Sequence, residues 1–526
     1  MYRALTLGAN VATAAKRKVS PEPVKTRRAE VEEVEIKKAK VAIKRVISDI
    51  EDAVVKKLKP AKEKSGTMDY LGLLEEVSNV VKLNSISLSE ESRMHSGLLG
   101  IDLILGRGIG PTMCTIFGPE QSAKTTLAIT IMAATINQGV PISTLWDAEQ
   151  SSGSSSDYIQ NILNEQGIHR PFEEIFGVRK KGVYTIKPLV YYQDSAVGED
   201  FFNWLHALLK RLPDKRFDND QWWYVYENTK PNQAKYLPLA DKVMSKANHG
   251  IWVPAKDDSL QAVIIVDSYP SLMPSAQDND EHTKAMAVQA RMFSLHLPRV
   301  KGFIRAKRIA LLGINQLRLN PGAMFGSPER EPCGEALKYN SDQRMRVYPR
   351  ALSGVPFHPK GEGMIEKEPS VDGSGEDTYR YIHCKTIKNK LSTPQQEMWL
   401  RLWVSDATGE ARGYDLVWDT FYTCFLCGII TGKRSSMRIN IPGLGEAKKN
   451  IDWLSFKKLI IGTAEQRAEV CKAIGYKTVN LRRGLINLSK KGALDALYWE
   501  AKQTKGNAKA KAEANDDDED EDDDAE

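Results

Sequence analysis

The fold of this chain is decided by the stretch Gly118-Pro-Glu-Gln-Ser-Ala-Lys124-Thr125. A short apolar segment, Met113 to Phe117, precedes it, and a segment rich in helix formers, Thr126 to Ala134, follows it. This order predicts a strand, a loop and a helix, which is the setting that a phosphate-binding loop requires. The N–H groups of such a loop surround phosphates, and the N-terminus of the helix adds positive potential.

The side chains of this loop predict how a nucleotide is bound. Lys124 is expected to reach the β- and γ-phosphates, and the Thr125 hydroxyl is expected to bind Mg²⁺. Ala123 stands where the usual pattern has glycine, so a Cβ lies where backbone and phosphate approach closely. A chance turn between a strand and a helix is the alternative interpretation. The predicted nucleotide-binding segment comprises Gly118, Pro119, Glu120, Gln121, Ser122, Ala123, Lys124, Thr125 and Thr126.

Three further apolar segments end in polar residues, namely 142–146 before Asp147-Ala-Glu149, 261–266 before Asp267, and 309–314 before Asn315-Gln316. In an open parallel sheet, ligands bind outside the carboxyl ends of the strands. Asp267 is therefore expected to hold Mg²⁺. Glu149 is expected to orient the attacking water, and Gln316 to sense the γ-phosphate. Each residue taken singly is also compatible with a cap of the next helix or turn.

The order of elements predicts an α/β fold with a mostly parallel sheet, because strand and helix signals alternate from 97 to about 210 and resume at 261. A small α-rich domain is predicted to follow this core. Both tails of the chain are expected to be disordered. The predicted parts are an N-terminal extension (1–66), a short helical segment (67–96), a core (97–412) with surface insertions (212–260 and 352–378), an α-rich domain (413–500), and a linker with an acidic tail (501–526).

Composition narrows the class of protein. The 526 residues allow three or four domains. Six cysteines are too few for a disulfide scaffold and indicate a reducing compartment. Cys424 and Cys427 have a metal-like spacing but no second pair, so buried helix residues are expected there instead of zinc ligands.

The net charge of +6 hides a basic body, because residues 516–526 contain ten acidic side chains and no basic one. A basic body suggests a polyanionic partner.

Nine stretches resemble the bacterial RecA recombinase family, including its phage relatives, and they follow the family's order over about residues 95–500. They are GIDLILGRGIGP (100–111), GPEQSAKTTLAI (118–129), WDAEQ (146–150), VIIVDSYPSLMP (263–274), QARMFS (289–294), INQLR (314–318), GAMFGSPE (322–329), GEALKY (334–339) and KTIKNKLSTP (385–394). The resemblance implies a RecA-like P-loop NTPase core that binds ATP and Mg²⁺. The extra material outside these stretches suggests a phage member.

The resemblance implies roles for individual residues. Glu149 resembles the catalytic glutamate, and Gln316 resembles the glutamine that links the γ-phosphate to the state of a DNA loop. Lys388 and Lys390 resemble two lysines that reach the nucleotide of a neighbouring subunit and neutralise charge in the transition state. Without the resemblance, such a lysine pair would be read as a solvated strand end. Tyr158 is a candidate for stacking on adenine. Residues 67–96 are expected at a subunit interface.

Two loops are candidates for binding single-stranded DNA. Residues 317–338 follow Gln316 directly and contain glycines and prolines without a period, and a loop this long inside a compact domain is more often functional than idle. Its glycine N–H groups suit phosphates, and its apolar side chains suit bases. The first loop is expected within 275–288. Glu335 and Cys333 depart from the family, which has a neutral amide and a glycine there. The predicted DNA-binding residues are Met286, Arg291, Ser294, Arg318, Met324, Phe325 and Gly334, with core packing as the alternative for Met286.

The C-terminal domain is also expected to contact DNA, as a duplex. The stretch IPGLGEAKK (441–449), taken alone, resembles a helix-hairpin-helix turn. In register with the family it resembles the stretch that precedes the helices of the C-terminal domain, which is the preferred interpretation. The acidic tail is expected to compete with DNA for basic surfaces.

The sequence therefore predicts an ATP-dependent recombination protein that forms filaments on single-stranded DNA, pairs it with a homologous duplex and hydrolyses ATP. The expected partners are single- and double-stranded DNA, further copies of the chain, and single-strand-binding and mediator proteins, without a membrane. The expected location is the cytoplasm of a bacterial cell, in the nucleoid or a phage DNA compartment. Two alternatives remain, a RecA-core ring helicase or motor and a non-hydrolysing DNA-binding scaffold, which Ala123 motivates.

Overall fold

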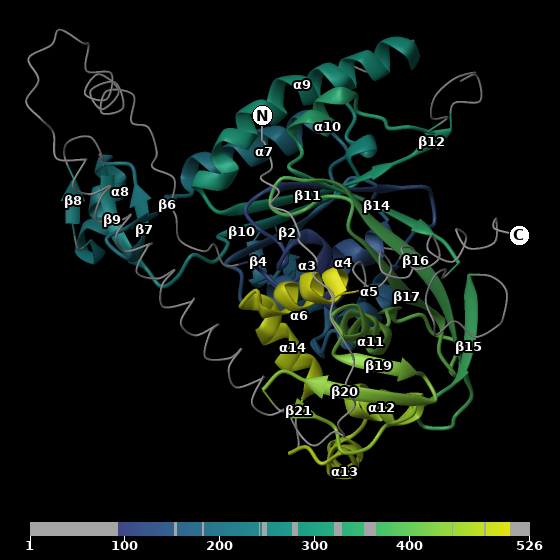
Figure 1. Cartoon of the computed structure of the whole chain (residues 1–526). Coiled ribbons are helices and arrows are strands. Elements are labelled where there is room, and N and C mark those ends of the chain that lie inside the picture. Colours follow the sequence, from purple (N-terminus) through teal and green to yellow (C-terminus); the bar gives the residue numbers. More distant parts are fainter. Residues whose placement is uncertain are drawn as a thin grey trace, which may run out of the picture. The chain divides into compact units, whose positions relative to one another are not determined.

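The computed structural model describes residues 93–151, 155–180, 183–240, 242–244, 250–275, 282–319, 329–351, 364–443, 445–477 and 480–504 (Figure 1). All of them belong to the compact unit Lys82–Glu526. The predicted N-terminal extension, most of the predicted segment 67–96 and the acidic tail lie outside the described residues. No helix in the described ranges is long and apolar enough to cross a membrane.

One large sheet organises the described part of the chain, with the strand order β18-β17-β16-β14-β1-β11-β10-β2-β5 and β15 paired to β16. Strands β14, β1, β11, β10, β2 and β5 run parallel to one another, and β15 to β18 extend the sheet with antiparallel pairs. The prediction of an α/β fold with a mostly parallel sheet is confirmed. The strands are β1 (Met113–Gly118), β2 (Ile142–Asp147), β5 (Tyr191–Gln193), β10 (Ala262–Asp267), β11 (Ile309–Gln316), β14 (Gln343–Pro349), β15 (Ile365–Pro369), β16 (Glu376–Asn389), β17 (Glu397–Ser405) and β18 (Gly413–Tyr414).

Alternating side chains of the central strands fill a core on each face of the sheet. Val263 and Ile265 of β10 join the cluster that contains α3 (Leu99–Leu105), α4 (Lys124–Asn137) and α5 (Ser156–Glu165). Ile264 and Val266 join the opposite cluster, with α7 (Gly198–Arg211), α9 (His282–Ala306) and α10 (Glu335–Asn340). Because successive side chains of a strand point to opposite faces, an unbroken apolar run such as that of β10 predicts a strand buried on both sides.

The described residues of the predicted insertion 212–260 form a small sheet with its own core. Its strands are β6 (Asp214–Asp218), β7 (Gln221–Tyr226), β8 (Lys242–Met244) and β9 (Gly250–Ala255), arranged antiparallel in the order β6-β7-β9-β8, together with α8 (Lys230–Tyr236) (Figure 1). Trp223, Val225 and Trp252 form the core of this sheet. The sequence showed no period here because the other face of β7 carries the half-buried Trp222, Tyr224 and Tyr226.

Two predicted boundaries are wrong in detail. Residues 364–378 were assigned to a surface insertion, but β15 and the first residues of β16 lie there and pair in the large sheet. The start of the α-rich domain at 413 cuts the same sheet, since β18 pairs with β17. Both differences arose because β15 and β18 are short strands, which carry weak sequence signals.

The C-terminal part combines helices with three short strands. Its elements are α11 (Leu416–Leu426), β19 (Ile430–Lys433), β20 (Ser436–Ile441), β21 (Gly445–Glu446), α12 (Trp453–Ile461), α13 (Ala464–Ile474) and α14 (Leu481–Lys490), and residues 493–504 are also helical. The stretch 441–449 belongs to the hairpin of β20 and β21, so it is not a helix-hairpin-helix turn. Its position before α12 agrees with the preferred interpretation. Cys424 lies in α11 and Cys427 is the C-cap of this helix, and both are buried, as predicted.

A buried ionic cluster joins this part to the large sheet. Arg401 of β17 is fully buried and lies 2.7 Å from Glu368 Oε1 and 2.6 Å from Asp415 Oδ2. Its guanidinium also lies 3.8 Å from the centre of the Tyr379 ring. On the C-terminal side, Lys457 lies 2.8 Å from Glu368. Further members of the cluster are Glu366 and Arg434. The charges are paired and hydrogen-bonded, which is the condition under which charge is tolerated in a core.

Replacing Arg401 by Met is expected to lower the free energy of unfolding by about 3–5 kcal/mol, because buried carboxylates would lose their cation. Urea unfolding followed by far-ultraviolet circular dichroism measures this change. Arg438→Met is the matched control, since Arg438 of β20 forms an exposed ion pair with Glu446 of β21 and such pairs contribute about 0–1 kcal/mol. Equal losses in the two variants would contradict a special contribution of the cluster.

Acid stability is expected to depend on His383 of β16. Burial, with smaller contributions from Arg350 and Lys385, lowers the pKa of His383 to about 4, although Glu397 opposes this. The unfolded chain binds a proton at this side chain below about pH 6.5, whereas the folded chain does so only near pH 4. Stability from this group is therefore lost as pH falls from about 6.5 to 4, by about 2–3 kcal/mol.

The test compares the urea midpoint at pH 7 and at pH 4.5 in the wild type, His383→Phe and His383→Gln. Both variants should lose part of the acid sensitivity, whatever their stability at pH 7. Variants whose stability falls with pH in parallel with the wild type would show that other groups cause the sensitivity.

Candidate nucleotide site

Four parallel strands bring their carboxyl ends together at one edge of the sheet. The ends of β1, β11, β10 and β2 are neighbours in that order. The N–H of Leu317 donates to Gly118 O over 3.1 Å, and the N–H of Glu149 donates to Asp267 O over 3.2 Å. The structure thus brings together the polar residues that were predicted from the ends of separate strands.

The loop between β1 and α4 depends on a close backbone contact at Gly118 and on left-handed backbone conformations at Gln121 and Ala123. A Cβ on Gly118 would lie 1.9 Å from Val347 O of β14, so only glycine fits where the loop leaves the sheet. Gln121 and Ala123 have φ values of 56° and 61°. Ala123 therefore adopts the left-handed conformation that glycine favours, and it directly precedes the first residue of α4.

The Lys124 ammonium lies within this loop. It donates to Pro119 O over 2.5 Å and to Ser122 Oγ over 3.2 Å, and Ser122 itself donates to Pro119 O over 2.8 Å. Burial lowers the pKa of Lys124, while Asp267, Glu149 and Glu120 oppose this shift. A buried ammonium that faces carboxylates at the N-terminus of a helix is placed to bind phosphate oxygens.

Thr125 and Asp267 form the part of the site that fits Mg²⁺. The side chain of Thr125 hydrogen-bonds Asp267, whose Oδ1 is buried and has no hydrogen-bond partner. Burial and the nearby Glu149 and Asp147 raise the pKa of Asp267 to about 7. A hydroxyl and an orphaned carboxylate oxygen are hard ligands of the kind that Mg²⁺ takes alongside phosphates. The described residues contain no cluster of three or more His, Cys, Asp or Glu side chains that could hold a metal alone.

The Glu149 carboxylate connects the ends of β2, β10 and β11. Its Oε1 accepts hydrogen bonds from Ser268 Oγ over 2.5 Å and from Gln316 Nε2 over 3.0 Å. Asn315, beside Gln316, donates in turn to Glu331 Oε2 over 3.3 Å. The carboxylate of Glu149 is exposed, so it can contact a water molecule while two neighbours fix its orientation.

The chain that leaves Gln316 enters a hairpin. Strand β12 (Arg318–Leu319) pairs antiparallel with β13 (Glu329–Arg330), and residues 320–328 at its tip, including Met324 and Phe325, lie outside the described residues. The returning strand is anchored to β14, because Glu329 pairs with Arg346 over 2.6 Å and Glu331 pairs with Arg344. A displacement of Gln316 would therefore act directly on the hairpin.

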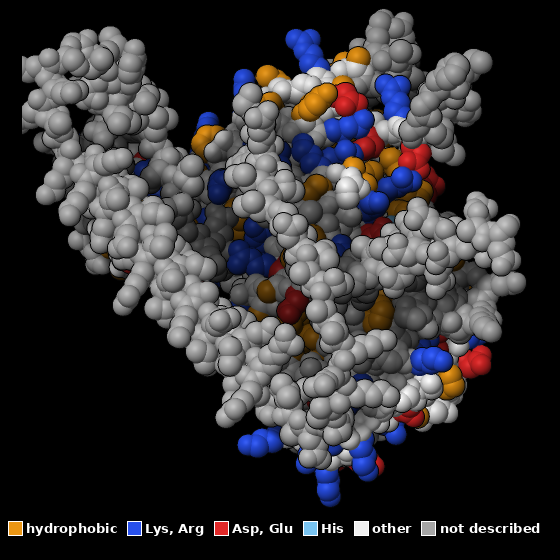
Figure 2. Space-filling model, in the orientation of Figure 1, with side chains coloured by type: hydrophobic (Ala, Val, Ile, Leu, Met, Phe, Trp, Pro, Cys, Tyr) orange, Lys and Arg blue, Asp and Glu red, His pale blue; other side chains and the backbone are white. Residues whose placement is uncertain are grey.

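The other predicted DNA-binding residues lie near the base of this hairpin or on α9. Arg291 and Ser294 are exposed on α9, and Arg318 is exposed on β12. Gly334 has a φ of 73°, and a Cβ there would lie 2.9 Å from Ala290 Cβ of α9. Figure 2 shows Lys and Arg side chains over α9, α10 and β12. The side chain of Met286 lies outside the described residues.

The two departures from the family have local consequences. Cys333 is buried with a φ of 67°, so a side chain occupies a left-handed position that would suit glycine. Glu335 begins α10 and pairs with Lys338 over 2.7 Å. Glu335 is thus partly neutralised within its own helix.

Tyr158 of α5 lies beside the first turn of α4. Its half-buried hydroxyl is 2.8 Å from Thr126 Oγ1. This contact places Tyr158 next to the loop between β1 and α4. Stacking on adenine stays a prediction.

The loop follows the carboxyl end of β1, whereas Lys388 and Lys390 lie near the opposite, N-terminal ends of β1 and β14. Strand β16 runs antiparallel to β14, with Lys388 opposite Arg344, and therefore ends near the start of β1. Lys388 Nζ donates to Lys338 O and Tyr339 O over 2.9 and 3.1 Å. Lys390 Nζ lies 3.6 Å from Asp342. Neither lysine can reach the loop of its own chain.

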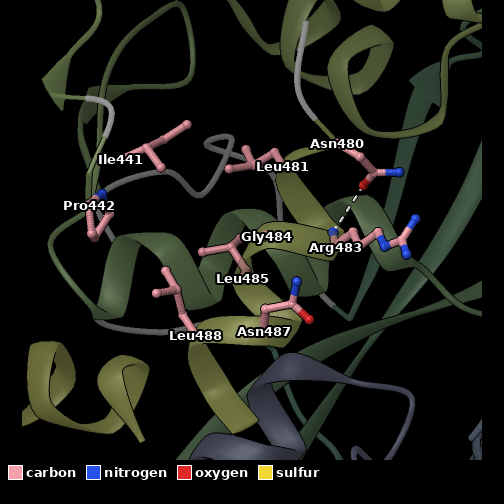
Figure 3. A pocket seen from close by; sticks show the side chains of 9 residues that line it. All are labelled: Ile441, Pro442, Asn480, Leu481, Arg483, Gly484, Leu485, Asn487 and Leu488. Atoms are coloured by element: carbon pink, nitrogen blue, oxygen red, sulfur yellow. Dashed lines mark hydrogen bonds between the residues drawn. The ribbon is translucent and has the colours of Figure 1, made fainter. Parts of the chain in front are cut away.

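A separate pocket of about 380 Å³ lies in the C-terminal part, between α14 and the turn after β20 (Figure 3). Leu481, Leu485 and Leu488 form its apolar wall, and Asn480 and Arg483 stand at one end. The pocket lacks carboxylates and does not include the loop after β1. It is therefore not part of the candidate nucleotide site.

Sequence reasoning missed three members of the site. Ser268 carries no sequence signal beyond its place after Asp267, and Glu331 stands in a long stretch without a period. Tyr414, whose hydroxyl donates to Ala123 O over 3.1 Å, lies 291 positions away in the sequence. No local pattern relates two residues at that separation, so only the paired strands of the folded sheet reveal the contact.

Comparisons with known proteins show sequence similarity to the RecA family. The RecA N-terminal domain matches residues 255–407. "Protein RecA" of Aquifex pyrophilus is 28% identical over 56% of this chain and 70% of its own length. "Protein RecA" of Aquifex aeolicus (strain VF5) is 31% identical over 43% and 56%. "Protein RecA" of Thermus aquaticus is 25% identical over 70% and 82%.

These three relatives come from cellular organisms and give no support to a phage origin, which stays a prediction. This chain has the parallel sheet and, at the ends of β1, β2, β10 and β11, the polar groups that the resemblance implies. From these observations together we conclude that the chain belongs to the RecA family.

Proposed function

We propose that this protein is an ATP-dependent recombinase that assembles on single-stranded DNA, pairs it with a homologous duplex and exchanges strands with DNA-stimulated ATP hydrolysis. The observation that carries the proposal is the 3.0 Å hydrogen bond between Gln316 and Glu149. It joins the candidate catalytic carboxylate to the strand that leads directly into the hairpin of β12 and β13. ATP hydrolysis and DNA contact would thereby be coupled through a single side chain.

In this proposal each polar group has a defined task. Lys124 binds the β- and γ-phosphates, and Thr125 and Asp267 hold Mg²⁺, which neutralises phosphate charge when it is bound. Glu149 orients the attacking water and accepts its proton. Gln316 responds to the γ-phosphate and shifts β12.

The opposite placement of the loop and the two lysines supports assembly. If Lys388 and Lys390 act on ATP, they do so on the ATP of another subunit, since the sheet separates them from their own loop. Such a head-to-tail contact between unlike surfaces produces a ring when it closes and a helical filament when it does not. We infer a filament, because the hairpin after Gln316 offers a DNA contact in every subunit. A ring motor remains the second candidate.

The same proposal includes the partners and the location. Arg291, Ser294, Arg318 and Gly334 would contact single-stranded DNA, together with Met286, Met324 and Phe325. The C-terminal part would contact the duplex, and single-strand-binding and mediator proteins would assist loading. Assembly would take place in the cytoplasm of a bacterial cell. Electron microscopy with DNA and a slowly hydrolysed ATP analogue, together with a strand-exchange assay, tests the proposal, and closed rings without filaments would favour the motor.

Lys124→Ala is expected to lower the DNA-stimulated rate of ATP hydrolysis at least about 100-fold, because the variant loses the cation that stabilises transferred phosphate charge. Phosphate release with and without single-stranded DNA measures this rate. Lys256→Ala is the matched control, since Lys256 is exposed and directly follows β9 of the small sheet formed by β6 to β9, outside the loop after β1. Equal background rates in wild type and Lys124→Ala would favour the non-hydrolysing scaffold.

Gln316→Ala is expected to separate nucleotide binding from DNA stimulation. The affinity for ATP should stay within about threefold of the wild type, because Lys124 and Thr125 are unchanged. The increase in ATP hydrolysis on adding single-stranded DNA should fall at least about 10-fold, as expected for the loss of a positioned hydrogen bond. Gln150→Ala serves as control, because Gln150 bonds Asp194 O instead of Glu149. Full DNA stimulation in Gln316→Ala would rule out this route of coupling.

A further inference from the structure

Ala123 adopts a conformation that alanine disfavours. Its φ and ψ are 61° and 29°, in the left-handed region where a Cβ crowds the backbone. The residue is the last before α4, so its conformation sets how the loop enters the helix. Something in the surrounding structure must favour this conformation, since the side chain itself opposes it.

The Ala123 carbonyl is held from two sides. The N–H of Leu127 donates to it over 3.0 Å within the first turn of α4. The hydroxyl of Tyr414 donates to it over 3.1 Å from a different element, β18. Both bonds depend on the direction of this carbonyl, which is set by the left-handed turn. The Tyr414 bond therefore favours the conformation that the alanine Cβ opposes.

Tyr414 is itself rigidly placed. Its side chain is 1% exposed, and its backbone pairs with Leu402 of β17. Gly413, with a φ of 88°, lets this strand approach α5, because a Cβ there would lie 2.9 Å from Ile162 Cγ1. Asp415, the next residue, is bound to the buried Arg401. Burial also raises the pKa of Tyr414, which keeps its hydroxyl protonated as a donor.

We propose that Tyr414 is a positioning residue for nucleotide binding, whose hydroxyl holds the Ala123 carbonyl and so keeps the loop in its phosphate-binding form. This inference rests on the proposed binding of ATP by the loop. In a loop with glycine at this position, the left-handed turn would need no such support. Tyr414 thus compensates for the alanine that distinguishes this chain from the usual loop pattern. The competing explanation is that Ala123 O only satisfies a buried tyrosine hydroxyl.

The test is a double-mutant cycle on the full chain. The dissociation constant of a fluorescent ATP analogue with Mg²⁺ is measured in wild type, Tyr414→Phe, Ala123→Gly and the double variant. Tyr414→Phe is expected to weaken binding about 5- to 10-fold when residue 123 is alanine, which corresponds to one hydrogen bond. The same change is expected to weaken binding less than about 2-fold when residue 123 is glycine.

Tyr476→Phe is the matched control, since the Tyr476 hydroxyl also donates to backbone carbonyls, those of Ile439 and Gly445, in the C-terminal part. It should leave the dissociation constant unchanged even if it lowers the urea midpoint as Tyr414→Phe does. An equal effect of Tyr414→Phe on both backgrounds, or no effect on either, would overturn the proposal. A wild type that does not bind the analogue at all would instead overturn the proposed function on which it rests.

Discussion

The buried guanidinium of Arg401 is the constraint on which the C-terminal half of the structure depends. It fixes β17 against the carboxylates of β15 and against Asp415 at the start of α11. Lys457 and Arg434 complete the charge balance from the C-terminal part. An ion pair of this kind adds little net stability over an apolar core, but it tolerates no substitution of one partner alone. The cluster therefore imposes one arrangement of the sheet edge, and β18, with Tyr414, follows from that arrangement.

The candidate site depends on a second constraint, the parallel order of four strands. Parallel strands deliver their carboxyl ends to one edge, and the chain places the loop after β1, three carboxylates and an amide there. The same order explains why the pKa of Asp267 is raised to about 7, since the side chain is buried near Glu149 and Asp147, and Lys124 opposes this shift. Burial and repulsion from the Glu149 and Asp147 carboxylates disfavour the ionised form of Asp267, and a cation at this side chain would favour it.

The sheet and most of the candidate site were predictable because each depends on local signals. The apolar runs of β10 and β11 and the residues that end them are continuous in sequence, and a parallel sheet brings continuous signals together without further information. The strand β15 was not predictable, because its buried face carries Glu366 and Glu368, which look like surface residues until Arg401 and Arg434 are placed beside them. The strands within 212–260 were also not predictable, since aromatic residues on both faces of β7 remove the alternation of apolar and polar residues that indicates a strand. The hydrogen bond between Tyr414 and Ala123 joins residues that are 291 positions apart in the sequence, and no local sequence pattern predicts such a contact.

The position of Lys388 and Lys390 gives an assembly of this protein a direction. Each chain has the candidate nucleotide loop at one end of its parallel strands and two lysines at the other, so a row of subunits would expose unlike surfaces at its two ends. The loop at one end would lack lysines from a neighbour, and the lysines at the other end would face no nucleotide. Under the proposed function, the terminal subunits would then differ chemically from those in the interior. Growth and loss of subunits at the two ends would have different rates even on a uniform strand of DNA.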